Sequence, residues 1–295
     1  MATLIHIYGT ARSGSTMLDL MLGNVPNAFS CGEVSAWFRP YRRHHFTIDC
    51  PCGQNPCSVW ERIAHVPESR FHATVIRELG VSFVIDSSKD LCWLIDAQKW
   101  AAAGQIQTVN LLLWKDPIDL VYSHWKRGQG LTLWRKEFIK CYSRFFETDL
   151  QFTAVNYNAL ANNPQQVLRA ICAAIGMPCP EGKERFWEKE HHYLFGSLGV
   201  RRQVQSRDSA IKDRPGFPPE FQARRNFLEE QIAKDSAVQE ILAILKQADV
   251  VSHAGYINGS RPVWSKQLSP VWLYGKRMIR LLRRYVPENF DPAAP

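Results

Sequence analysis

The feature that most constrains this chain is a strand, loop and helix pattern at its beginning. Residues 4–8 (LIHIY) form a short apolar run typical of a buried strand, and the residues after the loop repeat apolar side chains at helical spacing. Gly9 and Gly14 stand five positions apart between them, followed by a Ser-Thr pair. This outline is typical of a phosphate-binding loop, in which backbone N–H groups and a helix N-terminus hold an anion.

The loop lacks one part of a nucleotide triphosphatase site. Ser15 stands where such enzymes carry the lysine that reaches the β- and γ-phosphates, and Arg12 is the only cation in the loop. The pattern therefore favours a phosphate group over a magnesium-bound triphosphate. Because glycine- and serine-rich loops after a strand are common, the loop alone does not decide the function.

Glu33 places a carboxylate close in sequence to this loop. Such a group could act as a base. It could equally be a favourable charge near a helix start. The residues alone leave both interpretations open.

Strand-like runs alternate with helical patterns over the first 180 residues. The further strand runs are 81–86, 107–114 and 152–156, and the helical patterns are 91–103, 118–127 and 164–175. This alternation predicts an α/β fold with a P-loop-like parallel sheet flanked by helices. Ligands of such sheets bind beyond the carboxyl ends of the strands. The side chains expected at that edge are those of Arg12, Lys89, Lys115 and Tyr157.

The C-terminal part is predicted to be mainly helical. Residues 183–190 carry a helical pattern, 191–213 a polar loop, and 220–246 one or two surface helices. Residues 272–286 interleave basic and apolar side chains. That pattern predicts a helix that either docks on the body of the protein or lies on an anionic membrane surface.

Length and charge limit the domain organisation and the classes of partner. The 295-residue chain has a formal net charge of +8, which favours an acidic ligand but is too mild an excess to predict nucleic-acid binding. It shows no apolar run of about 18 residues and no signal-peptide pattern, so we expect a cytoplasmic protein. We expect a single domain over 1–295, with a core of 1–180 and a helical and loop extension over 181–295.

A cluster of metal-capable residues precedes the second strand run. Its members are His44, His45, Cys50, Cys52 and Cys57. The C-x-C-x4-C spacing lacks the paired C-x-x-C units typical of structural zinc sites. Zinc, a cysteine pair and simple loop thiols remain alternatives, so we assign no metal-binding residue.

Taken in order, these segments resemble the sulfotransferases that use 3′-phosphoadenosine 5′-phosphosulfate (PAPS), over about residues 1–180. Residues 9–16 resemble the family's 5′-phosphosulfate loop, with alanine where proline is common. Residues 115–127 resemble its 3′-phosphate segment, although Lys115 replaces the usual arginine. Residues 157–164 resemble the Y-E-x-L-x-x-x-P element that follows the next strand.

The resemblance implies which residues hold PAPS. The predicted cofactor-binding residues are Arg12, Ser13, Gly14, Ser15, Thr16, Lys115, Ser123, Arg127, Tyr157 and Arg201. Arg201 is included as the best match to a glycine-arginine element that comes late in the family's sequences.

Two short elements resemble those of prokaryotic enzymes related to tyrosylprotein and carbohydrate sulfotransferases. The tripeptide C-G-E at 31–33 matches one, and S-K-D at 88–90 resembles the family's N-K-D. By this resemblance Glu33 is the general base and Lys89 is the cation at the leaving oxygen. Arg12 would share in stabilising the negative charge that builds during the reaction.

The expected reaction is the metal-independent transfer of a sulfuryl group from PAPS to a substrate hydroxyl. A carbohydrate or glycolipid acceptor is favoured, with tyrosine or a small natural product next. Tryptophans that could stack on a sugar include Trp37, Trp93, Trp125 and Trp134. Two other functions remain open: a P-loop kinase-like nucleotide enzyme, and a non-catalytic protein that binds anions or a membrane surface through 272–286.

Overall fold

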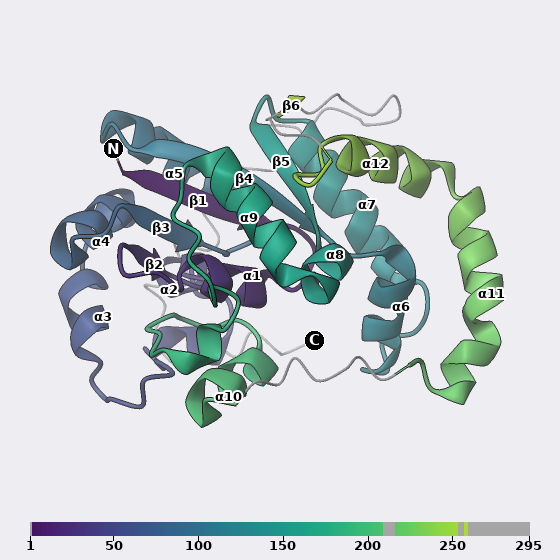
Figure 1. The fold of residues 1–295 in the computed structure, drawn as a ribbon, viewed down its shortest axis with the longest axis horizontal. Helices are drawn as coiled ribbons and strands as arrows, with labels where there is room; N and C mark the ends of the chain where they lie inside the picture. Colours follow the sequence, from purple (N-terminus) through teal and green to yellow (C-terminus); the bar gives the residue numbers. More distant parts are fainter. Residues whose placement is uncertain (1, 209–215, 253–256, 259–295) are drawn as a thin grey trace.

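The computed structural model describes residues 2–208, 216–252 and 257–258, so the predicted basic helix over 272–286 lies outside the described residues. Within the described part, a six-stranded sheet carries helices on both faces (Figure 1). Its strands are β1 (Thr3–Tyr8), β2 (Ala28–Ser30), β3 (Phe83–Asp86), β4 (Gln107–Trp114), β5 (Gln151–Asn156) and β6 (Ile257–Asn258).

The strand order is β2-β3-β1-β4-β5-β6, with β1 near the centre. The first five strands run parallel, and β6 pairs antiparallel with the edge of β5. Parallel neighbours need a crossover connection, and helices supply it between consecutive strands. The predicted parallel sheet flanked by helices is therefore confirmed.

One face of the sheet is covered by α1 (Ser15–Leu22), α8 (Tyr157–Asn162) and α9 (Pro164–Ile175), which lie in front of the strands in Figure 1. Alternate residues of β1, Ile5 and Ile7, are buried in the same hydrophobic cluster as the apolar sides of α1 and α9. Because strand side chains alternate between faces, this pattern fixes which side of β1 meets these helices.

The opposite face is covered by two groups of helices. On the β3 side lie α3 (Ser58–Ile63), α4 (Phe71–Leu79) and α5 (Leu91–Ala103), and their cluster includes Leu4 of β1. On the β5 side lies a second cluster. It draws on α6 (Pro117–Trp125), α7 (Leu133–Phe146), α11 (Pro219–Lys234) and α12 (Ser236–Gln247). The C-terminal helices α11 and α12 pack on α6 and α7 respectively.

The expectation of one or two helices over 220–246 is confirmed by α11 and α12. None of the helices within the described residues has the length and apolar character needed to cross a membrane.

Two details predicted for the C-terminal part are wrong. Residues 183–190 form turns and one short 3-10 segment, η3 (Phe186–Glu188), instead of a helix. Contacts fix this segment, since the ammonium of Lys183 is buried and donates to the carbonyl of Leu22 at 2.9 Å. The predicted loop over 191–213 contains α10 (Leu198–Ser206). That helix buries Val204 and packs Val200 only partly against the core, so its apolar side is too narrow to be recognised in the sequence.

Candidate functional site

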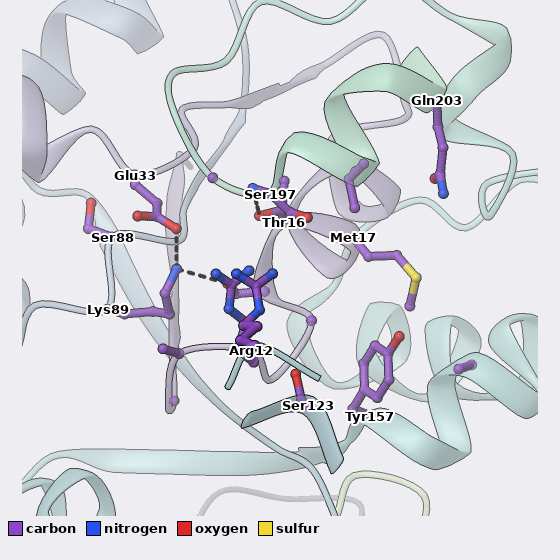
Figure 2. A pocket seen from close by; sticks show the side chains of 18 of the residues that line it. Arg12, Thr16, Met17, Glu33, Ser88, Lys89, Ser123, Tyr157, Ser197 and Gln203 are labelled. Atoms are coloured by element: carbon purple, nitrogen blue, oxygen red, sulfur yellow. Dashed lines mark hydrogen bonds and ion pairs between the residues drawn. The ribbon is translucent and has the colours of Figure 1, made fainter. Parts of the chain in front are cut away.

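A cavity of about 860 Å³ lies where the loops at the carboxyl ends of the parallel strands meet (Figure 2). This volume is in the range of cofactor and small-molecule sites. The lining residues come from the loop after β1, the segments after β2 and β3, and the helices α1, α6, α8 and α10. Those with polar or aromatic side chains are Arg12, Ser15, Thr16, Glu33, Tyr41, Arg42, Ser88, Lys89, Ser123, Arg127, Tyr157, Asn162, Ser197 and Gln203.

Two glycines let the loop after β1 approach its neighbours closely. A Cβ on Gly9 would lie 2.2 Å from the carbonyl oxygen of Leu113, and a Cβ on Gly14 would lie 2.2 Å from the ring of Tyr157. Gly14 also has a left-handed φ of 94°, as does Arg12 with a φ of 71°. Non-glycine residues rarely adopt this conformation, and those that do cluster at functional sites. The loop leads into the N-terminus of α1, a position that favours an anion.

Three guanidinium groups line this cavity, those of Arg12, Arg42 and Arg127. Partial burial, the largest cause, and the positive charge of Arg127 lower the pKa of Arg12. Glu33 opposes this shift, and Arg42 adds to it. Arg127 and Arg42 therefore disfavour the charge on Arg12, and an anionic ligand would relieve that repulsion.

An ion pair joins the segments after β2 and β3 at the cavity wall. The ammonium of Lys89 lies 2.5 Å from Oε1 of Glu33 and donates to the hydroxyl of Ser15 at 3.0 Å. Figure 2 shows this ammonium with a dashed line to the carboxylate of Glu33 and a second one toward the loop after β1. The arrangement places a carboxylate and a cation side by side next to the loop after β1, and such groups can perform proton transfer and charge stabilisation.

A backbone bridge to a distant segment positions Glu33. Its N–H donates to the carbonyl of Leu194 at 2.9 Å, and the Leu194 N–H donates to Cys31 at 3.1 Å. Gly32, between them, has a φ of 71°, and a Cβ there would lie 2.2 Å from the Leu194 oxygen. The bridge therefore requires glycine before the carboxylate.

The turn that carries Lys89 is fixed by two aspartates. Lys89 has a left-handed φ of 55°, and the next residue, Asp90, caps α5 by accepting from its first backbone N–H groups. Asp86, at the end of β3, accepts from the backbone and hydroxyl of Ser88. Burial opposes ionisation of Asp86, but its interactions with His72, His6 and Ser88 together outweigh burial and lower the pKa of Asp86 to about 2.

The predicted 3′-phosphate residues divide into two groups. Ser123 of α6 and Arg127 line the cavity, as does Tyr157 at the start of α8. Lys115 is not among the lining residues; its ammonium lies 4.7 Å from the ring centroid of Tyr157. Lys115 thus packs on the ring of Tyr157, which lines the cavity, and does not line the cavity itself.

Two more of the predicted cofactor residues lie away from the cavity surface. Ser13 is fully buried inside the loop. Arg201 of α10 is turned away, with its guanidinium donating to the carbonyl of Asp49 at 3.0 Å and pairing with the Asp49 carboxylate.

Six polar or aromatic lining residues were not among the predicted site residues, namely Tyr41, Arg42, Ser88, Asn162, Ser197 and Gln203. A signal for Arg42 exists in the basic run R-P-Y-R-R at 39–43. Ser197 is held by a hydrogen bond from its backbone N–H to the hydroxyl of Thr16 at 3.1 Å. No local sequence pattern predicts this contact, because its two residues are 181 positions apart in the chain.

No model of a known protein family matches the chain, and no curated protein does. Solved structures, in contrast, do match this chain. The sulfotransferase domain of the Synechococcus PCC 7002 olefin synthase superposes with a TM-score of 0.51 at 17% identity, covering 79% of this chain and 95% of that one. The sulfotransferase domain from the curacin biosynthetic pathway gives a TM-score of 0.51 at 14% identity, covering 79% and 98%. This chain therefore has the fold seen in sulfotransferase domains.

Proposed function

We propose that this protein is a sulfotransferase that moves a sulfuryl group from PAPS to a substrate hydroxyl. The observation that carries the proposal is the position of Lys89, whose ammonium contacts both the Glu33 carboxylate and Ser15 of the phosphate loop. A triphosphatase would have a lysine at position 15 itself. Here the cation comes from the neighbouring strand, together with a carboxylate that can serve as a base.

The cavity fits a donor that is anionic at both ends. The loop at Gly14 leaves no room for a side chain beside Tyr157. This loop, together with Arg12, suits a phosphosulfate group. Ser123 and Arg127 line the same cavity and suit a second phosphate. When bound, PAPS would supply an activated sulfuryl group.

Each catalytic residue then has a separate task. Glu33 accepts the proton of the acceptor hydroxyl as that oxygen becomes a nucleophile. Lys89 and Arg12 stabilise negative charge on the oxygens at the reacting end of the donor. Because a sulfuryl group carries less charge than a γ-phosphate, side-chain cations and backbone N–H groups can replace the magnesium that kinases need.

We propose a hydroxyl acceptor, with a carbohydrate or glycolipid favoured over tyrosine or a small natural product. The tryptophans considered as a stacking surface (Trp37, Trp93, Trp125 and Trp134) do not line the cavity. Among the described residues, the aromatic side chains in its wall are Tyr41 and Tyr157. Tyr41 would therefore be the ring available to an acceptor near Glu33 and Arg42.

Calorimetry with the product nucleotide 3′-phosphoadenosine 5′-phosphate (PAP), without added metal, tests the donor site. We expect binding without metal that weakens in Arg127→Gln but not in Arg43→Gln, an exposed arginine outside the cavity wall. Preference for Mg-ATP over PAP would favour a kinase-like enzyme. Binding of neither nucleotide would favour a non-catalytic anion- or membrane-binding protein.

A further inference from the structure

We propose that a structural zinc ion binds where two distant segments bring four side chains together, those of Cys50, Cys52, Cys57 and His192. Their sulfur and imidazole nitrogen atoms all lie within 4.8 Å of one another. His192 follows Cys57 by 135 positions, so the fold rather than the local chain creates the cluster. Three thiolates and one imidazole are a ligand set that zinc binds tetrahedrally.

The distances within the cluster suit a tetrahedral metal. Nδ1 of His192 lies 3.7 Å from Sγ of Cys50 and 3.4 Å from Sγ of Cys57. With Zn–S bonds of about 2.3 Å and Zn–N bonds of about 2.1 Å, tetrahedral ligand atoms lie about 3.6 Å apart. The side chains therefore need little movement to reach zinc-binding geometry.

A disulfide does not account for this arrangement. All eight cysteines of the chain are free thiols in the structure. A tight turn brings the first two thiols together, since the N–H of Gly53 donates to the carbonyl of Cys50 at 3.3 Å and Gly53 has a φ of 78°. Neither a third thiol nor an imidazole would be needed for a cysteine pair.

The second nitrogen of His192 has the partner expected of a metal ligand. Nε2 lies 3.1 Å from Oε1 of Glu190. Metal-bound histidines commonly donate their other ring N–H to a carboxylate, which fixes the tautomer and the ring orientation. A proton on Nε2 leaves Nδ1 with its lone pair directed at the thiols.

The site would be structural. Four protein ligands complete a tetrahedral shell and leave no open position for a substrate. Cys50 and Cys57 are buried, with 5% and 2% of their surface exposed. None of the four ligands lines the cavity that holds Glu33 and Lys89.

The metal would nevertheless affect the active site through the backbone. Two residues after His192, Leu194 makes the backbone bridge that positions Glu33. The same two segments are joined again beside the cluster, where Arg201 binds Asp49. Zinc at this junction would stabilise the backbone segment that hydrogen-bonds to Glu33.

Elemental analysis of the full-length protein, purified without chelators from zinc-supplemented cells, tests the proposal. We expect about one zinc per chain, lost in Cys52→Ser and in His192→Asn. Cys92→Ser and His44→Asn are matched controls that should retain it, because neither residue belongs to the cluster. Wild-type protein with less than about a tenth of an equivalent, or full zinc in both ligand variants, would contradict the site.

Cobalt substitution in the wild-type protein gives an answer even where the ligand variants fail to fold. Co²⁺ bound by three thiolates should show strong thiolate-to-metal charge-transfer absorption and tetrahedral visible bands. Their absence after cobalt loading would overturn the proposal. A disulfide between two of the three cysteines, detected by mass spectrometry of the unreduced protein, would overturn it as well.

Discussion

The ammonium of Lys89 touches the carboxylate of Glu33 at 2.5 Å and the first residue of α1, Ser15, at 3.0 Å. It also donates to the carbonyl of Ser87 at 3.2 Å. One cation thus joins the start of α1 to the carboxylate proposed as the base. Lys89 makes these contacts from a left-handed backbone conformation, with a φ of 55°.

Replacing this lysine should slow the reaction without removing the donor site. We expect Lys89→Ala to lower kcat by about two to three orders of magnitude, as loss of a charge-stabilising donor does elsewhere. PAP affinity should change far less, because Arg12 and Arg127 remain. Steady-state kinetics beside Lys99→Ala, an exposed lysine on α5, provides the control. Near-normal turnover in Lys89→Ala would remove its proposed role.

Glu33→Gln should remove the base while preserving the shape of the site. We expect kcat to fall by about 10²–10⁴-fold, the usual contribution of a positioned base. Glu61→Gln, on the exposed side of α3, should behave as wild type. If Glu33→Gln kept full activity, the base would have to be another group.

Arg42→Gln tests whether the cavity's excess of positive charge binds the donor. Removing one of three clustered guanidinium groups should weaken PAP binding by about tenfold at low salt, and by less at high salt because ions screen the charges. Arg43→Gln removes a neighbouring exposed charge that is outside the cavity wall. Equal losses in the two variants would indicate a general charge effect instead of a specific contact.

Two of the helices that flank the sheet could be predicted because their ends carry clear sequence signals. The predicted helix over 91–103 matches α5, whose cap Asp90 accepts from two backbone N–H groups. The predicted helix over 164–175 matches α9, which begins with proline after the capping Asn163 and ends at a left-handed Gly176. Such caps are local chemistry, so the sequence displays them directly.

The helix α7 was not predicted, although its sequence contains the necessary spacing. Trp134, Phe138, Tyr142 and Phe145 recur at intervals of four and three and are buried. Charged residues between them make the segment look polar on average. By contrast, the basic run at 39–43 does not indicate that Arg42 lines the cavity, and no local signal places His192 beside the cysteines, because the fold alone brings these groups together.

The carboxyl edge of the parallel sheet could be predicted as the location of the site, but the side chains that line the cavity there could not all be predicted. Arg12, Glu33 and Lys89 all follow strands, so topology places them together. Lys115 also follows a strand, yet it packs on the ring of Tyr157. Strand position fixes the location of a backbone and leaves the direction of a long side chain undecided.

Gly14→Ala should damage both stability and donor binding. The new methyl group would need a left-handed backbone and would overlap the ring of Tyr157. Gly80→Ala has the same backbone requirement with open space around it, so it isolates the conformational cost of about 1 kcal/mol. We expect a larger loss in Gly14→Ala, measured by thermal unfolding, and partial recovery in the double variant with Tyr157→Ala. Purely additive effects would show that the overlap is not the cause.

Asp19 of α1 is a buried carboxyl whose ionisation the fold disfavours. It accepts a hydrogen bond from the hydroxyl of Ser87 at 2.6 Å, and its other oxygen is buried with no hydrogen-bond partner. Burial raises the pKa of Asp19 from 3.8 to about 7, although Ser87 opposes the shift. Between pH 3.8 and about pH 7, the folded protein therefore keeps a proton on Asp19 that the unfolded chain has lost.

Asp19→Asn should make the protein less sensitive to rising pH. Where the folded state binds the extra proton, stability falls as pH rises, by up to about 1.4 kcal/mol per pH unit for one group. The asparagine variant does not titrate, so its free energy of unfolding relative to that of the wild type should rise steadily between about pH 4 and pH 7. Denaturant unfolding of both proteins across this range measures the difference, in which the titration of other groups cancels. The exposed Asp149→Asn should show no such trend, and a flat difference for Asp19→Asn would mean that this carboxyl ionises normally in the folded protein.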